Sequence, residues 1–209
     1  MNYSSEELKE QAYTQVKKMI FTKKLTPGEV IFQEDLSVIL GIQSDLLNEA
    51  LEKLATESIL VPSSFGGMQV RALSTQEILE TYDCRIILEA KATELFTKLA
   101  SQEKIDDLRN LLVPFENGTC NANVFYKIDR YFHYLIVKNC GNQKLFELYQ
   151  QGNFLSSMEL IGLIDISLEG VIQEHLDIIS AIHHRDAKKA SKLMARHIER
   201  TKEAFYENC

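Results

Sequence analysis

From Thr75 onward the chain consists almost entirely of helix-forming segments. Apolar residues such as Ile128 and Phe132 recur at three- and four-residue steps, a period typical of helices with one buried face. With only 9 Gly and 3 Pro in 209 residues, few positions interrupt this pattern. The spacing predicts helices over 75–99, 102–113, 121–139, 142–161, 167–184 and 186–206. We expect a polar loop at 116–123 and a weaker break near residue 162.

The first 73 residues follow a different pattern. Two helices are predicted over 6–24 and 32–41, and a third begins at Ser44 or Asp45. Two β-prone runs, "SILVPSS" and "MQVRAL", then flank Gly66-Gly67 and predict a hairpin. Helix, turn and helix followed by such a hairpin is typical of a winged helix-turn-helix.

The predicted fold is therefore mainly α, with two domains. Residues 1–73 form a winged helix-turn-helix with a small β wing, and residues 74–209 form an all-helical bundle of six to seven helices. A composition of 45% hydrophobic and 25% charged residues is that of a soluble globular protein.

The same composition narrows the cellular context. No apolar run approaches the ~18 residues of a membrane span, and the polar, acidic N-terminus does not resemble a signal peptide. We therefore expect a cytoplasmic protein that does not enter a membrane. The four cysteines form no CxxC pair, which favours reduced thiols, and Cys84 and Cys140 are interpreted as small packing residues. The net charge of −7 argues against a generally basic nucleic-acid binder.

Four residues of the predicted bundle could hold a metal ion. Asp129 and His133 are four residues apart and therefore project from one helix face. His175 and His197 lie on two further helical segments that could fold back against that face. Three imidazoles and one carboxylate suit zinc, nickel, iron or manganese. The alternative interpretation is an ordinary Asp–His pair on a solvated helix face.

Five stretches together resemble the GntR family of bacterial transcription regulators, in its FadR-like branch with an FCD effector domain. They are "AYTQVKKMIFTKKLTPGEVIFQEDLSVILGI", "NEALEKLATESILV", "LSTQEILETYDCRIILEAKATEL", "IDRYFHYLIVKNCGN" and "EHLDIISAIHHRDAKKASKLMARHIER". The first two are similar to the family's DNA-reading domain and the third to its junction with the effector domain. The last two are similar to the helices that carry the family's metal ligands, and the resemblance covers nearly the whole chain.

The resemblance implies a divalent metal site formed by four residues, with zinc or nickel as the first expectation and iron or manganese as alternatives. These residues are Asp129, His133, His175 and His197. It also implies that Arg85 meets the carboxylate of a small organic acid effector. The alternative for Arg85 is an intrahelical pair with Glu89 at i+4. His183 and His184 match no ligand position and are interpreted as turn residues.

The chain departs from the family in the recognition helix. Where the family usually carries "SRTPVREAL", this chain has "QSDLLNEAL", so that Ser44 and Asn48 replace two arginines. Residues 1–73 hold seven Lys or Arg against ten Asp or Glu, a net charge of −3 that opposes attraction to phosphates. The residues expected to contact an operator are Gln43, Ser44, Asn48, Lys53, Gly66 and Gly67. Further cations available for phosphates are Lys17, Lys18, Lys23, Lys24 and Arg71.

The predicted function is a homodimeric, ligand-responsive transcription regulator that binds a double-stranded DNA operator and a small carboxylic acid. One alternative is a diverged metal and acid sensor that acts through a protein partner. Another is a metal-dependent hydrolase, but such an enzyme needs a general base beside the metal. Because neither Glu174 nor Asp177 is clearly placed for that role, we expect a non-enzymatic protein.

Overall fold

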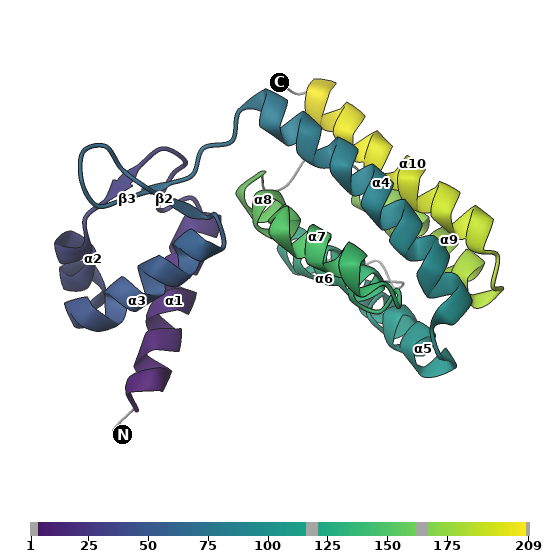
Figure 1. Cartoon of the computed structure of the whole chain (residues 1–209), viewed down its shortest axis with the longest axis horizontal. Coiled ribbons are helices and arrows are strands. Elements are labelled where there is room, and N and C mark those ends of the chain that lie inside the picture. The colour runs from purple at the N-terminus through teal and green to yellow at the C-terminus, as the bar shows by residue number, and fades with distance from the viewer. Residues whose placement is uncertain (1–3, 116–120, 162–166, 208–209) are drawn as a thin grey trace. The chain divides into compact units, whose positions relative to one another are not determined.

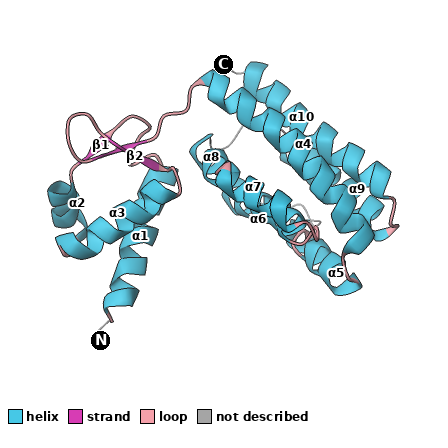
Figure 2. Cartoon of the chain, viewed as in Figure 1, coloured by secondary structure: helices cyan, strands magenta, loops and turns pink. Residues whose placement is uncertain are grey.

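The computed structural model describes residues 4–115, 121–161 and 167–207. These residues form helices and one small sheet (Figures 1 and 2). Within them, no helix is long and apolar enough to cross a membrane. Two compact units can be distinguished: Met1–Ser74 with Ser156–Gly162, and Thr75–Leu155 with Leu163–Cys209.

The N-terminal segment of the first unit contains three helices and three short strands. The helices are α1 (Ser5–Phe21), α2 (Gln33–Leu40) and α3 (Ser44–Thr56). The strands are β1 (Val30–Ile31), β2 (Leu60–Pro62) and β3 (Met68–Val70), in the antiparallel order β1-β3-β2. The mainly α fold with a winged helix-turn-helix is thus confirmed.

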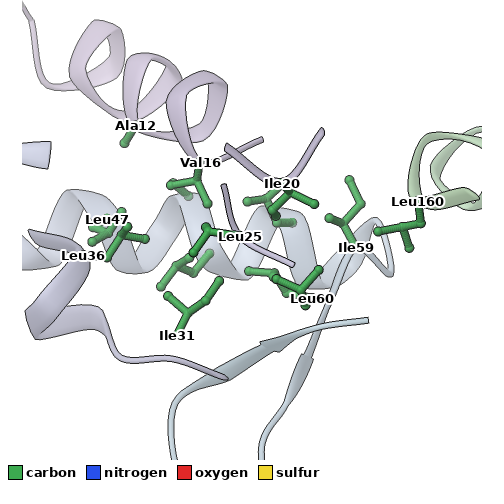
Figure 3. Packing of buried hydrophobic residues seen from close by; sticks show 14 residues of the cluster. Ala12, Val16, Ile20, Leu25, Ile31, Leu36, Leu47, Ile59, Leu60 and Leu160 are labelled. Atoms are coloured by element: carbon green, nitrogen blue, oxygen red, sulfur yellow. The ribbon is translucent and has the colours of Figure 1, made fainter. Parts of the chain in front are cut away.

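The core of this unit lies between α1, α3 and the sheet (Figure 3). Ala12, Val16 and Ile20 on α1 are spaced by four residues, so they form one buried stripe. That stripe packs against α3, whose Leu47 and Leu54 are fully buried. The apolar spacing along α1 and α3 therefore determines how the two helices pack together.

The wing has one more strand than the sequence predicts. β1 pairs with β3 through Val30 opposite Gln69 and Ile31 opposite Met68. Two residues are too short a run to show an alternating pattern, so the strand is visible only once its partner is in place. Gly67 is required at this contact: its φ is 72°, and a Cβ would lie 2.5 Å from the Ile31 carbonyl oxygen.

The second unit is built from seven described helices. They are α4 (Thr75–Leu99), α5 (Gln102–Asn110), α6 (Ala122–Lys138), α7 (Gln143–Gln151), α8 (Phe154–Ile161, part of which belongs to the first unit), α9 (Leu168–His183) and α10 (Ala187–Glu207). A 3-10 turn, η1 (Val113–Phe115), follows α5. In Figure 1, α4 runs beside α10, and it also contacts α6 and α9.

Three local predictions are wrong. The single helix predicted over 142–161 is two helices, because Asn153 takes a left-handed φ of 50° directly after Gly152. The helix predicted to reach residue 113 ends at Asn110 and is followed by the 3-10 turn. Cys84 is exposed rather than packed, whereas Cys140 is buried as predicted. The break near 162 and residues 116–120 of the predicted loop lie outside the described residues.

The buried face of α4 is unusual because it includes two charged side chains. Its stripe runs through Ile78, Tyr82, Arg85, Glu89 and Phe96, at steps of three, four and seven residues. Arg85 and Glu89 thus occupy positions that helical spacing normally assigns to apolar residues. Buried charges need partners, and these partners lead to the candidate site.

Candidate metal centre

Four potential ligands from three helices meet inside the second unit. Asp129 and His133 come from α6, His175 from α9 and His197 from α10. One ligand atom from each lies within 4.8 Å of the others. The three histidines are buried and the Asp129 side chain is 14% exposed. The structure therefore brings together all four residues that the sequence selects.

Helix periodicity explains why the histidines point inward. His175 is flanked on the buried face of α9 by Val171 and Ile178, and His197 on α10 by Met194. Since residues three or four apart share one face, burial of the apolar neighbours carries each imidazole into the bundle. The bundle core, rather than a loop, positions the ligands.

Each imidazole is oriented through its Nδ1 atom. His133 Nδ1 lies 2.5 Å from Glu89 Oε2, and His197 Nδ1 lies 2.8 Å from Glu174 Oε2. His175 Nδ1 lies 2.8 Å from the carbonyl oxygen of Val171, one turn earlier in α9. With Nδ1 engaged in all three rings, Nε2 is the atom left to bind a metal. Such outer contacts are typical of metal-ligating histidines.

Two of the Nε2 atoms lie close to Asp129. Its Oδ1 lies 3.0 Å from His175 Nε2 and 3.6 Å from His133 Nε2. Although His175 Nε2 is buried and close to this oxygen, it makes no hydrogen bond of acceptable geometry with any described residue. An unsatisfied buried polar atom costs about 1–3 kcal/mol. A cation bound between these atoms would satisfy it, so the residues present fit a metal ion.

The close packing of these buried groups also shifts their pKa values. Burial opposes ionisation of Asp129, but His133 and His175 hold its pKa well below the ordinary value. Burial and the neighbouring His175 lower the pKa of His197 to about 4. Burial would also lower the pKa of His133, but the carboxylates of Glu89 and Asp129 raise it to about 9. A metal binding here would meet an anionic Asp129 and a neutral His197, and would displace a proton from His133.

Three nitrogens and one carboxylate oxygen form a borderline-soft donor set, which suits zinc, nickel, iron or manganese. Asp129, His133, His175 and His197 would hold the ion. A metal that accepts more than four ligands would keep open positions for oxygen atoms of a small acid. The bound ion would supply positive charge inside the buried core of the bundle.

Arg85 is engaged by a neighbour on its own helix. Its Nε lies 2.6 Å from Glu89 Oε1, and the two side chains are 3% and 1% exposed. The Tyr149 hydroxyl donates to the same oxygen at 3.2 Å. The intrahelical pair considered as the alternative for Arg85 is therefore present. Contact between Arg85 and an effector stays a prediction.

The sequence does not identify the two carboxylates that hold histidines of the centre in place. From sequence, Glu89 is expected only as a possible partner of Arg85, and Glu174 only as a general base that is not clearly placed. Glu174 contacts Nδ1 of His197 and Nε of Arg200. It therefore supports His197 and is not placed as a general base beside a metal. The available signal was the position of Glu89 in the apolar stripe of α4. His183 and His184, by contrast, are exposed at the end of α9.

The residues expected to read DNA lie on the first unit. Gln43 and Ser44 are exposed at the N-terminus of α3, and the Asn48 amide donates to Glu52 at 2.8 Å. Gly66 and Gly67 form the turn between β2 and β3. Contact of these residues with DNA stays a prediction.

Several cations of this unit are paired with acids of the same unit. Lys53 Nζ lies 2.9 Å from Glu10 and 3.8 Å from the centre of the Tyr13 ring. Lys17 Nζ lies 2.7 Å from Glu57. Lys18, Lys23 and Lys24 are exposed. Part of the positive charge expected to attract DNA phosphates is thus neutralised by acids of the same unit.

Comparison with known proteins agrees with this architecture. The FCD domain family matches residues 80–200, which is more than half of the chain and includes all four candidate ligands. The chain belongs to the FCD family. The relatives of this FCD protein are named as transcriptional regulators or repressors, and the solved structures of similar fold include a putative GntR transcriptional regulator from Rhodococcus.

One relative and two solved structures illustrate the similarity. The HTH-type transcriptional regulator YdhC of Bacillus subtilis is 28% identical over 195 residues, covering 90% of this chain and 86% of YdhC. McbR/YncC of E. coli has a TM-score of 0.77 at 18% identity, covering 96% of this chain and 98% of that one. The metal-free FCD domain of TM0439 has a TM-score of 0.57 at 22% identity, covering 66% of this chain and 96% of that domain.

Proposed function

We propose that this FCD protein is a metal-dependent sensor of a small organic acid that controls binding of a homodimer to a DNA operator. A divalent ion held by Asp129, His133, His175 and His197 would anchor the acid. Residues 1–73 would read DNA and residues 74–209 would bind metal and acid, in the cytoplasm.

One observation carries the metal part of the proposal. All three histidines are held at Nδ1, by Glu89, Val171 and Glu174, and one ligand atom from each lies within 4.8 Å of the others and of Asp129. A cluster of buried histidines that served only packing would have no need for this common orientation. The description of the TM0439 FCD domain as metal-free is consistent with a domain that can also be loaded.

The sensing part of the proposal follows from charge. A bound divalent ion with open coordination positions attracts a carboxylate, and its surroundings determine which acid fits. The acid would change operator affinity only if it favours one arrangement of the homodimer over another. Zinc or nickel is proposed first, with iron or manganese as alternatives.

A DNA-binding assay tests this function. Fluorescence anisotropy would measure affinity for the protein's own upstream DNA over a salt series, in four states: metal-free, metal-loaded, acid alone, and both together. We expect specific binding at least ~10³ tighter than to scrambled DNA, and an acid effect of tenfold or more that requires metal. An acid effect that is equal without metal would contradict the proposal.

The paired lysines favour one second candidate, a diverged sensor that acts through a protein partner. Lys17 and Lys53 are partnered by Glu57 and Glu10, and the α3 surface carries Asp45. Metal and acid binding without DNA affinity at any salt would support this candidate over the first.

A further inference from the structure

Glu89 is a carboxylate in the middle of the bundle core, with 0% of the residue exposed. Its neighbours on the buried face of α4 are Tyr82, Arg85 and Phe96. A carboxylate moved from water to such a place loses hydration that only close partners can replace. The identity and placement of those partners indicate what it does.

The two oxygens of Glu89 have separate partners. Oε2 lies 2.5 Å from Nδ1 of His133. Oε1 lies 2.6 Å from Nε of Arg85 and accepts the Tyr149 hydroxyl at 3.2 Å. One oxygen therefore faces the candidate ligand, and the other is held by a cation and a phenol. This double attachment leaves the carboxylate little freedom to rotate away from His133.

We propose that Glu89 is a positioning residue of the metal centre, which holds Nδ1 of His133 so that Nε2 faces the ion, and that Arg85 and Tyr149 hold Glu89 in that orientation. The inference rests on the proposed metal site. It gives Arg85 a role in supporting a ligand, separate from any contact with an effector.

The other two histidines provide a comparison within the same site. His197 is supported by Glu174, whose side chain is 28% exposed and which also binds Arg200. His175 is supported by a backbone carbonyl of its own helix. Because water weakens the contact made by Glu174, removal of Glu89 should lower metal affinity more than removal of Glu174.

Metal affinity measured on the full chain tests the inference. Co²⁺ is the probe, because its visible absorption reports the geometry of its ligands, and chelator competition gives the dissociation constant. We expect about a 10-fold loss of affinity in Glu89→Gln, which keeps an acceptor without charge, and up to about 100-fold in Glu89→Leu. Glu174→Gln should lose less than Glu89→Gln. The Co²⁺ bands should shift in both Glu89 variants.

The control separates support of a ligand from support of the fold. Thr97→Val removes another buried hydrogen-bonding group of α4, whose hydroxyl donates to the Thr93 carbonyl. It should lower thermal stability but leave Co²⁺ affinity and absorption bands unchanged. Because Glu89→Leu leaves Arg85 buried without its partner, the double variant Arg85→Met/Glu89→Leu is measured as well, and it should fold and show the same loss of affinity.

The possible failures are distinguishable. Wild-type affinity and absorption bands in Glu89→Gln and in the double variant would overturn the role of Glu89 alone. Wild-type protein that binds no Co²⁺ or Zn²⁺ would overturn the proposed metal centre, and this inference with it.

Discussion

The candidate metal centre and the exposed surface of α3 both place polar side chains close together, but in opposite surroundings. Around the centre, Glu89, His133 and His175 are buried, and each has a partner at a defined atom. On α3, Ser44 and Lys53 face solvent, and Lys53 pairs with an acid that is 64% exposed. Burial makes each contact in the first region strong and specific, whereas water and salt weaken those in the second.

This difference determines how many substitutions each region tolerates. Replacing a buried polar residue of the centre leaves its partner unsatisfied, so the site tolerates few substitutions. Exposed ion pairs contribute about 0–1 kcal/mol each, so the α3 surface can change its charges with little loss of stability. Substitutions in each region should therefore have effects of very different size.

The largest effect is expected from His175→Ala. Its Nε2 lies 3.0 Å from Asp129 Oδ1, so the variant loses one of the four proposed ligands. Metal affinity should fall by more than about 100-fold, beyond the range of outer-shell changes. Competition with a Zn²⁺ chelator measures this effect. The exposed His184 at the C-terminal end of α9 provides the control, and His184→Ala should bind metal as wild type does. Equal metal affinities in the two variants would exclude His175 as a ligand.

The second effect tests whether α3 is a weakened DNA reader. Ser44→Arg together with Asn48→Arg should raise DNA affinity by about 10- to 100-fold, because each arginine adds a phosphate or guanine contact worth about 1 kcal/mol, the lower end of the range for such contacts. The log–log salt slope should become steeper by about 1–2. Anisotropy titrations at several salt concentrations measure both quantities.

A charge-matched variant gives the control for that experiment. Gln143→Arg with Gln173→Arg adds the same charge at exposed positions of the second unit. If it raises DNA affinity as much as the α3 variant does, net charge explains the gain and α3 has no special part in it.

The third effect compares two glycines of the wing. Both have positive φ, so alanine costs about 1–3 kcal/mol at either position. A Cβ at Gly66 meets open space, whereas one at Gly67 collides with the Ile31 carbonyl oxygen. Gly67→Ala should therefore lower the urea midpoint more than Gly66→Ala, and amide exchange of Met68–Val70 should accelerate. Equal destabilisation would mean that β1 does not pair with β3 in solution.

The smallest effect is expected from Lys53→Gln. The variant removes the exposed pair with Glu10 and the contact of Nζ with the Tyr13 ring, and it should change the free energy of unfolding by less than about 2 kcal/mol. Urea unfolding, with Lys188→Gln as an exposed control, measures it. A loss above about 2 kcal/mol would show that this pair contributes far more than its exposure implies.

Local spacing in the sequence determined much of this protein. The period of three and four residues predicted the helices, and Gly66-Gly67 predicted the hairpin. Asp129 and His133 are four positions apart, and this spacing alone places both on one face of α6. These features depend on neighbours along the chain, so they are legible without a structure.

Tertiary packing decided the rest. Three features depend on residues far apart in sequence: ligand atoms of His175 and His197 lie within 4.8 Å of one on Asp129, Glu89 contacts His133 from another helix, and β1 pairs with β3. By spacing alone, Arg85 and Glu89 at i and i+4 resemble an ordinary surface pair. The structure shows that both lie on the buried face of α4. Burial and distance between helices, which spacing along one helix does not encode, give that pair its place beside the metal centre.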